Sequence, residues 1–236
     1  MMDHESAAPA FYDEVDTPAL ILDKAKLTRN IRKMAEFVAG GPAKLRPHAK
    51  THKCVEIAQL QLDAGAVGIT CAKVGEAEAL ADGGIPDILI ANEIIGALKI
   101  ARLVELAKRC TITVAVDDAE NVRRLSEAAL AGGVTLRCYV EVNIGMDRCG
   151  VEPGESALTL ARQVAAADGL LFCGLQAYEG HLQNLEPFEE RAVCAPRRIC
   201  ARRSRPRSAS RREASASTRS AAAAPARTRL PGGSRG

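Results

Sequence analysis

The feature that most constrains the fold is a regular alternation of short β-branched or aliphatic runs with helix-like stretches through residues 17–190. Ile57, Leu60 and Ala64 show helical spacing, and Gly132-Gly133 is typical of a helix end. Strands that alternate with helices of about 10–15 residues predict a parallel sheet, either open or closed into a barrel. The expected strands are 18–22, 44–47, 67–71, 88–91, 111–116, 136–143 and 170–178, and the expected helices are 24–39, 53–64, 74–82, 97–108, 118–131 and 156–167, with another helix starting at 186–190.

The placement of polar residues favours a barrel over an open sheet. A dinucleotide-binding sheet would carry G-x-G-x-x-G after its first strand, and no such motif opens a helix here. The C-terminal strand ends of a (β/α)8 barrel form its active-site face. We therefore expect an α/β fold, an incomplete (β/α)8 TIM barrel, because only six expected strands follow Lys44. The polar residues that follow expected strands lie at 47–53, 70–73, 91–93, 142–148 and 178–181.

The end of the chain differs from the body in charge. Residues 191–236 hold thirteen arginines and a single acid, Glu213, so the body is acidic and the tail is basic. Ala, Arg and Ser dominate the tail, which has too few apolar residues to offset chain entropy and is expected to be disordered. A natural basic arm, an interaction tail and a GC-rich gene read out of frame are the three explanations. The abrupt change after Glu190 favours the frame error.

Three regions follow from these patterns: a flexible N-terminus at 1–16, a folded unit at 17–190 and a disordered tail at 191–236. No apolar run reaches membrane-spanning length, and the acidic start of the chain lacks the features of a signal peptide. The eight cysteines are scattered without a C-x-x-C pair, so we expect them to be mostly reduced and buried. The sequence predicts a cytoplasmic protein without a membrane partner.

The densest group of candidate functional residues is the segment 46–53, Arg-Pro-His-Ala-Lys-Thr-His-Lys. A lysine at a strand end, such as Lys50, forms a Schiff base with a carbonyl cofactor when its amine is deprotonated. The alternative is a solvated basic loop. The four-residue spacing of His48 and His52 suits a metal only on a helix, and this segment leaves a strand without a neighbouring acid. We therefore expect no metal site here.

Two further candidates lie at or just beyond the ends of the last two expected strands. Arg148 lies between two glycines, where its guanidinium either donates to a phenolate-like oxygen or pairs with Asp147 or Glu141. Tyr178 either stacks on or hydrogen-bonds a ring, or packs at the barrel rim. These residue types alone leave both alternatives open.

Four segments together resemble a known family: Thr-Pro-Ala-Leu at 17–20, the segment 46–53, Gly-Ile-Thr-Cys-Ala at 68–72 with Gly-Glu-Ala-Glu at 75–78, and Gly-Leu-Gln-Ala-Tyr at 174–178. They are similar to the D-threonine aldolase and D-serine dehydratase family. Its members are fold-type III pyridoxal-phosphate enzymes related to the alanine racemase N-terminal domain. The resemblance covers residues 15–190.

The resemblance implies roles for five residues. Lys50 would carry the cofactor as a Schiff base, Arg148 would contact the cofactor's 3-oxygen, and Tyr178 would lie at its pyridine nitrogen. His48 and His52 would support Lys50 at the cofactor. The implied partner is a small D-β-hydroxy amino acid, which is cleaved by a retro-aldol reaction or dehydrated, and the family forms homodimers.

The chain departs from the family after residue 191. Members continue with two more barrel strands, a glycine/threonine-rich phosphate loop and a domain that binds a divalent metal. We find none of these in the tail, so we expect weak or absent activity and no metal ligands in this chain. A non-catalytic pyridoxal-phosphate-binding protein and a basic-tailed nucleic-acid-binding protein are the alternatives, and a nucleic-acid partner is the less favoured.

Overall fold

The computed structural model of the chain describes residues 14–192. These residues form one five-stranded sheet with helices between its strands. The strands are β1 (Ile69–Cys71), β2 (Asp87–Glu93), β3 (Thr111–Val116), β4 (Leu136–Glu141) and β5 (Leu170–Gln176). The helices are α1 (Lys24–Ala39), α2 (Val55–Asp63), α3 (Val74–Asp82), α4 (Ala97–Ala107), α5 (Ala119–Gly132), α6 (Glu155–Ala166) and the 3-10 helix η2 (Gly180–Leu182), and residues 188–192 are also helical.

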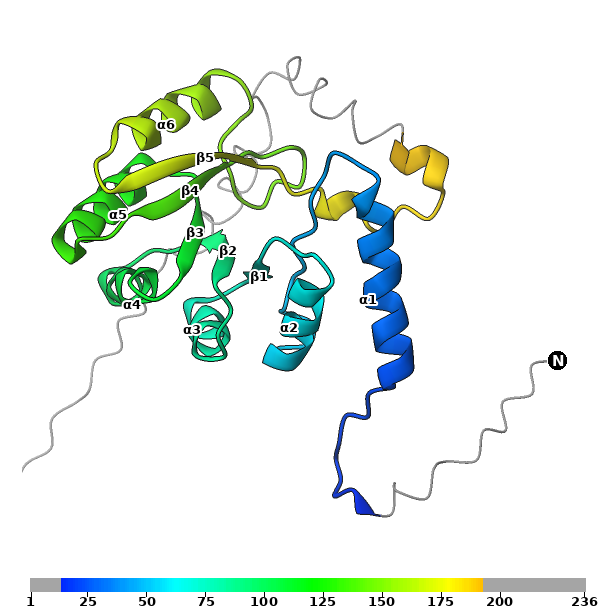
Figure 1. Cartoon of the computed structure of the whole chain (residues 1–236). Coiled ribbons are helices and arrows are strands. Elements are labelled where there is room, and N and C mark those ends of the chain that lie inside the picture. Colours follow the sequence, from blue (N-terminus) through cyan, green and yellow to red (C-terminus); the bar gives the residue numbers. More distant parts are fainter. Residues whose placement is uncertain (1–13, 193–236) are drawn as a thin grey trace, which may run out of the picture.

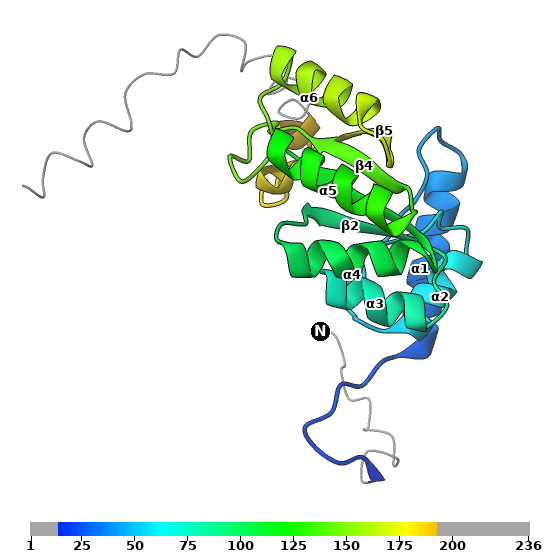
Figure 2. The same cartoon turned by 90° about the vertical axis from the view of Figure 1, so that its left-hand side faces the viewer.

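All five strands run parallel, and their order in the sheet is their order along the chain. A helix joins each strand to the next, and α3 to α6 lie on one side of the curved sheet (Figures 1 and 2). This sequential parallel order is the arrangement of a (β/α)8 barrel. The described residues complete five strands of such a barrel, so the prediction of an incomplete barrel is confirmed.

The hydrophobic core lies between the sheet and these helices. Alternate residues of a strand point to the same face, and those that face the helices are almost fully buried. Leu103 of α4 and Leu125 of α5 complete this layer and are inaccessible to solvent. The buried strand residues of the layer are Ile88, Ile90, Ile112, Val114, Val116, Leu136, Cys138 and Val140.

The opposite face of the sheet carries a charged group near the start of the strands. Arg46 donates from Nη1 to Asp87 Oδ1 over 2.8 Å, and Arg137 Nη1 lies 3.5 Å from Asp87 Oδ2. Gly68 makes the approach of Arg46 possible, because a Cβ at this position would lie 2.0 Å from Arg46 Nη1. The three charged side chains therefore link the segment before β1 to β2 and β4.

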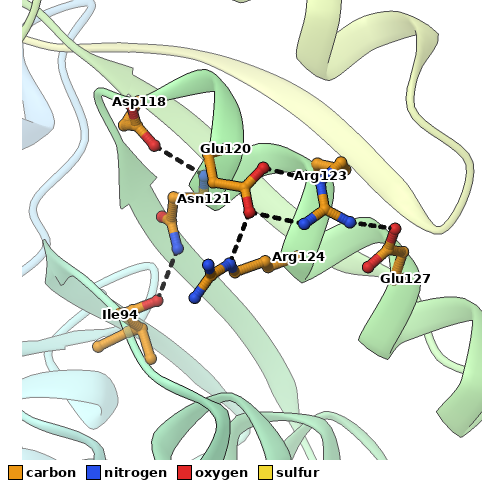
Figure 3. A network of polar contacts seen from close by, with 7 residues as sticks. All are labelled: Ile94, Asp118, Glu120, Asn121, Arg123, Arg124 and Glu127. Carbon is orange, nitrogen blue, oxygen red and sulfur yellow. Dashed lines mark hydrogen bonds and ion pairs between the residues drawn. The ribbon is translucent and has the colours of Figure 1, made fainter.

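The N-terminus of α5 is tied to the loop after β2 (Figure 3). Asp118 caps the helix by accepting a hydrogen bond from the Asn121 backbone over 2.9 Å, and the Asn121 side chain donates to the Ile94 carbonyl over 2.9 Å. On the exposed side, Glu120 pairs with Arg123 and Arg124. These contacts hold the end of β3 at the edge where the strand ends gather.

Two predicted strands are wrong. Residues 18–22 form no strand, and Leu20 is fully exposed, because no described segment pairs with this stretch. The segment 44–47 is not a regular strand either, although Val67 N donates to Leu45 O and Thr70 N donates to Pro47 O. Proline has no amide hydrogen, so a regular ladder is interrupted there and only the bridge between His48 and Thr70 forms.

The other expected elements form within a few residues of their predicted ends, and α1, α3 and β3 have the predicted bounds. No helix of residues 14–192 is long and apolar enough to cross a membrane. The six cysteines in this range are free, but only Cys71 and Cys138 are buried, so the expectation that most are buried is wrong for the others. The predicted flexible N-terminus up to residue 13 and the predicted tail from residue 193 lie outside the described residues.

Candidate functional site

The candidate site lies along the edge where the parallel strands end. The turn with Lys50 follows the segment that bridges to β1, Glu93 ends β2, and Glu141 ends β4. Gln176 ends β5, and Tyr178 follows it. Side chains at the C-terminal ends of neighbouring parallel strands meet at one edge, as the polar segments of the sequence predicted.

Lys50 lies exposed in a tight turn that leaves the first edge of the sheet. Ala49 N donates to Thr70 O over 2.7 Å, and Lys53 N donates to Ala49 O over 2.8 Å. Lys53 adopts a left-handed conformation with φ of 48°, which closes the turn. The backbone therefore fixes where the Lys50 side chain starts and leaves its amine open to solvent.

His48 and His52 hold this turn from inside. Burial lowers the pKa of His48, and the Lys50 ammonium lowers it further. Burial also lowers the pKa of His52. Neutral rings can accept hydrogen bonds, and Nδ1 of His48 accepts from Lys50 N over 3.2 Å while Nδ1 of His52 accepts from Cys54 N over 3.1 Å. Both histidines thus stabilise the turn through these hydrogen bonds. Among the described residues they do not belong to a group of side chains that could hold a metal ion.

A cavity of about 780 Å³ lies beside the Lys50 turn, between the ends of β1 and β2 and the first turns of α3 and α4. Lys53 reaches Glu76 Oε1 over 3.4 Å, and Ala72 N donates to Glu76 Oε2 over 2.8 Å. Burial acts against the ionised form of Glu76, but these two contacts outweigh it and lower the pKa of the carboxyl. The remaining polar lining residues are Lys73, Asn92, Glu93, Lys99 and Arg102.

Arg148 and Tyr178 meet at the other end of the strand edge. The Arg148 guanidinium lies 4.9 Å from the centre of the Tyr178 ring, which is a cation–π contact. Tyr178 is 41% exposed and packs against Gly180, where a Cβ would lie 2.4 Å from the ring. Contact with the Cys149 thiol raises the pKa of Arg148, and the nearby Glu141 carboxyl adds to this. The pair presents a fixed cation and a phenol at one corner of the site.

Glu141 lies beneath this pair and is 3% exposed. Its carboxyl accepts hydrogen bonds from Gln176 Nε2 on β5 and from Cys149 Sγ, the latter over 3.6 Å. Burial raises the pKa of Glu141, although the Gln176 amide favours its ionised form. Burial also raises the pKa of the Cys149 thiol to about 11, so Cys149 is a poor nucleophile.

Potential ligand atoms of Glu93, Glu141 and Cys149 lie within 4.8 Å of one another. The Arg148 cation next to this group disfavours a divalent ion, and we assign no metal to it. Glu93 and Glu141 stand out only once the strands are in register. From the sequence alone, Glu141 is one of two ordinary ion-pair partners of Arg148 and Gln176 has no predicted role, since nothing in the local pattern shows that these residues meet.

The structure groups the predicted site residues into two sets. Lys50, His48 and His52 share one turn, and Arg148 contacts Tyr178. Within residues 14–192 no hydrogen bond or ion pair joins the two sets, and β1, β2 and β3 separate them in the sheet. Both sets of residues lie at the edge of the sheet where the strands end. A ligand that contacts both sets must therefore lie across the C-terminal ends of the strands.

Comparisons with known proteins agree with this architecture. Residues 22–228 match the family described as alanine racemase, N-terminal domain. The chain is 46% identical over 180 residues to the 3-hydroxy-D-aspartate aldolase of Paracoccus denitrificans, covering 75% of this chain and 46% of that protein. It is also 46% identical over 181 residues to a D-threonine aldolase from Arthrobacter sp., covering 76% of this chain and 48% of the relative.

A solved structure shows the same arrangement. The crystal structure of D-threonine aldolase from Filomicrobium marinum superposes with a TM-score of 0.77 at 49% identity, and the match covers 78% of this chain and 50% of that one. The chain therefore spans about half the length of the relatives that it matches.

Proposed function

Because the chain belongs to the alanine racemase N-terminal domain family, we propose that it supplies the cofactor-binding barrel of a pyridoxal-phosphate-dependent lyase that acts on D-β-hydroxy amino acids. The observation that carries this proposal is the pair of residue sets at one strand edge, with an open lysine in one and an arginine–phenol pair in the other. The two relatives that are 46% identical to this chain over 180 and 181 residues are both named aldolases. We therefore favour aldol cleavage over dehydration.

The described residues fit the protein side of a pyridoxal-phosphate site. When bound, the cofactor acts as an electron sink for the bonds at the substrate's α-carbon. Lys50 would hold it through the amine, because its turn leaves that amine exposed and unpaired by any described acid. Neutral His48 and His52 would keep this turn in place by accepting backbone hydrogen bonds, as they do here.

Arg148 and Tyr178 would hold the ring of the cofactor. A guanidinium that is fixed over a phenol donates hydrogen bonds in a set direction, which suits the cofactor's 3-oxygen. A neutral phenol at the pyridine nitrogen leaves that nitrogen less protonated than a carboxylate would. The proposed assignment is therefore Arg148 at the 3-oxygen and Tyr178 at the ring nitrogen.

Other parts of the site are not supplied by the described residues. We identify no glycine/threonine-rich phosphate loop at the strand ends within residues 14–192. The acidic group of Glu93 and Glu141 does not fit a divalent metal because Arg148 lies beside it. We therefore propose cofactor binding at Lys50 for this chain and turnover for the whole protein. A homodimer and a cytoplasmic location belong to the same proposal.

Borohydride trapping tests the binding step. The chain is incubated with pyridoxal phosphate, reduced and mapped by peptide mass spectrometry, with Lys50→Ala as the test variant and Lys73→Ala as the matched control. Lys73 is an exposed lysine beside the same cavity. We expect one pyridoxyl adduct, on Lys50, in the original chain and in the control, and none in Lys50→Ala. An adduct spread over many lysines would contradict the assignment.

Turnover is tested separately. Aldol cleavage of D-threonine breaks its Cα–Cβ bond and releases glycine and acetaldehyde, whereas dehydration releases ammonia and a keto acid. Both sets of products are measured with the chain alone and with a protein extended to the length of the relatives. Trapping at Lys50 without either set of products from the extended protein would favour a non-catalytic cofactor-binding role.

A further inference from the structure

Glu141 is the one acidic or basic residue among residues 14–192 that is buried, with 3% of its surface exposed. A buried carboxyl destabilises the fold unless hydrogen bonds and opposite charge compensate for the loss of water. Its position at the end of β4 puts it at the strand edge that forms the candidate site. Such a residue calls for an explanation beyond packing, because an apolar side chain would fill the same space at lower cost.

The strand register provides the first hydrogen bond. Glu141 pairs with Gln176 across β4 and β5, so both side chains point to the same face of the sheet. The Gln176 amide donates to one carboxyl oxygen of Glu141, and the backbone N–H of Val142 donates to Gln176 O over 2.8 Å. The carboxyl of Glu141 is thus fixed by the sheet itself and not by a mobile loop.

The second hydrogen bond comes from the loop that carries Arg148. Cys149 Sγ donates to the other oxygen of Glu141, and the same thiol contacts the Arg148 guanidinium. Cys149 therefore links the buried carboxyl to the cation. Arg148 in turn lies over the ring of Tyr178, which follows the strand that provides Gln176.

The backbone of this loop is closed tightly onto β4. Val151 N donates to Glu141 O over 2.9 Å, and Gly150 N donates to Asp117 Oδ2 over 3.0 Å. Gly150 has a φ of 94°, and a Cβ there would lie 2.7 Å from Asn143 N. The start of the Arg148 side chain is thus set by the backbone, and only its guanidinium needs further orientation.

The charges agree with this geometry. Arg148 attracts the Glu141 carboxylate, whereas Glu93 at the end of β2 repels it. The Arg148 cation is therefore drawn toward the buried acid at the end of β4. Without the Glu141 carboxyl, water would compete for the hydrogen bonds of the Arg148 guanidinium.

We propose that Glu141 is the positioning residue for Arg148: held by Gln176 and linked through Cys149, its carboxyl keeps the guanidinium over the Tyr178 ring and directed at the cofactor. The orientation of Arg148 is a property of the chain alone. The consequence for the cofactor rests on the function proposed above.

The first test needs no cofactor. The ring current of Tyr178 displaces the NMR resonances of the Arg148 side chain, and Arg148→Lys and Tyr178→Leu identify the displaced signals. We expect Glu141→Gln to move these signals back toward ordinary arginine positions and Glu141→Asp to restore part of the displacement. Glu155→Gln, which removes an exposed acid from the first turn of α6, is the matched control and should leave them in place. Unchanged backbone signals from β2 and β3 exclude a general loss of structure.

The second test is a double-mutant cycle on pyridoxal-phosphate affinity, measured by absorbance of the lysine-bound cofactor. We expect Glu141→Gln and Arg148→Lys each to weaken binding about tenfold. The double variant should be no weaker than Arg148→Lys alone, because both changes remove one interaction.

The outcomes separate the two proposals. If the original chain takes up no cofactor at Lys50, the proposed function fails and the NMR result still decides the role of Glu141. If the cofactor binds but Glu141→Gln changes neither the Arg148 signals nor the affinity, the positioning role is overturned and the proposed function stands. Additive losses in the cycle would also overturn it, since they would show that Glu141 acts independently of Arg148.

Discussion

The centre of the sheet and its two flanks are packed very differently. The helix-facing residues of β2, β3 and β4 are almost inaccessible, whereas α1 has no buried residue among its sixteen. At the other flank, Leu171 and Leu175 of β5 are each at least half exposed. A parallel strand is stabilised only when it has a neighbour on each side and helices over its face, and in the described residues only the central strands have both.

The flanks nevertheless carry the residues of the proposed site. Lys50 follows the irregular segment at one flank, and Tyr178 follows β5 at the other. The stable centre positions both through short connections, and the flanks leave their side chains accessible. This division is the usual one for barrels, in which packing resides in the strands and function in the loops at their ends.

The largest expected effect on the free energy of unfolding comes from a substitution in the packed centre. Leu103→Ala on α4 removes an inaccessible side chain and should lower the free energy of unfolding by about 3 kcal/mol, because it leaves a cavity in the core. Phe37→Ala on α1 is the counterpart at the flank: its side chain is 82% exposed, and the expected change is within about 0.5 kcal/mol. Urea unfolding of the two variants measures the difference, and equal losses would show that α1 is as well packed as the centre.

A smaller effect is expected where the flank joins the centre. Gly68→Ala places a Cβ 2.7 Å from Asp87 O as well as against Arg46, so the ion pair must separate. We expect a loss of about 2 kcal/mol from this overpacking. Gly40→Ala is the matched control, because nothing lies within 4 Å of an added Cβ there. Thermal unfolding distinguishes the two, and similar melting temperatures would argue against the close approach of Arg46.

The cap of α5 should matter less. Asp118→Ala removes the hydrogen bond to Asn121 N and is expected to cost about 1 kcal/mol. Lys73→Ala replaces an N-cap residue of α3 whose side chain makes no capping hydrogen bond, so it should leave stability unchanged. Denaturant midpoints of both variants provide the measurement. A loss in Lys73→Ala of the same size would mean that the hydrogen bond is not the cause.

The smallest effect expected depends on pH. Burial raises the pKa of Glu141 in the folded chain above its pKa in the unfolded chain. The stability that the protonated carboxyl contributes is therefore fully present below the unfolded pKa, and it is lost as the pH rises through the folded pKa. Glu141→Gln cannot ionise and should gain stability relative to the original chain as pH rises from 5 to 8. Urea unfolding across this range tests the sign. A variant that instead loses stability with rising pH would show that Arg148 outweighs the effect of burial.

Much of the fold was predictable because its signals are local. The helix over 24–39 and the strand over 111–116 have periodic apolar residues and clear ends, so the predicted bounds are the observed ones. The strands expected at 18–22 and 44–47 carry the same local signal but do not form regular strands. Strand formation depends on a partner, and the first stretch has none among the described residues while Pro47 interrupts the second.

The sequence by itself determined the order of strands and helices, the parallel sheet, and the placement of Lys50, Arg148 and Tyr178 at strand ends. These depend on residue type and spacing within short windows. Only the tertiary structure decided that Glu141 meets Gln176, that Cys149 links Glu141 to Arg148, and that Arg46 passes over Gly68 to reach Asp87. Such contacts depend on strand register and backbone path, which arise from packing between segments that are distant in the chain.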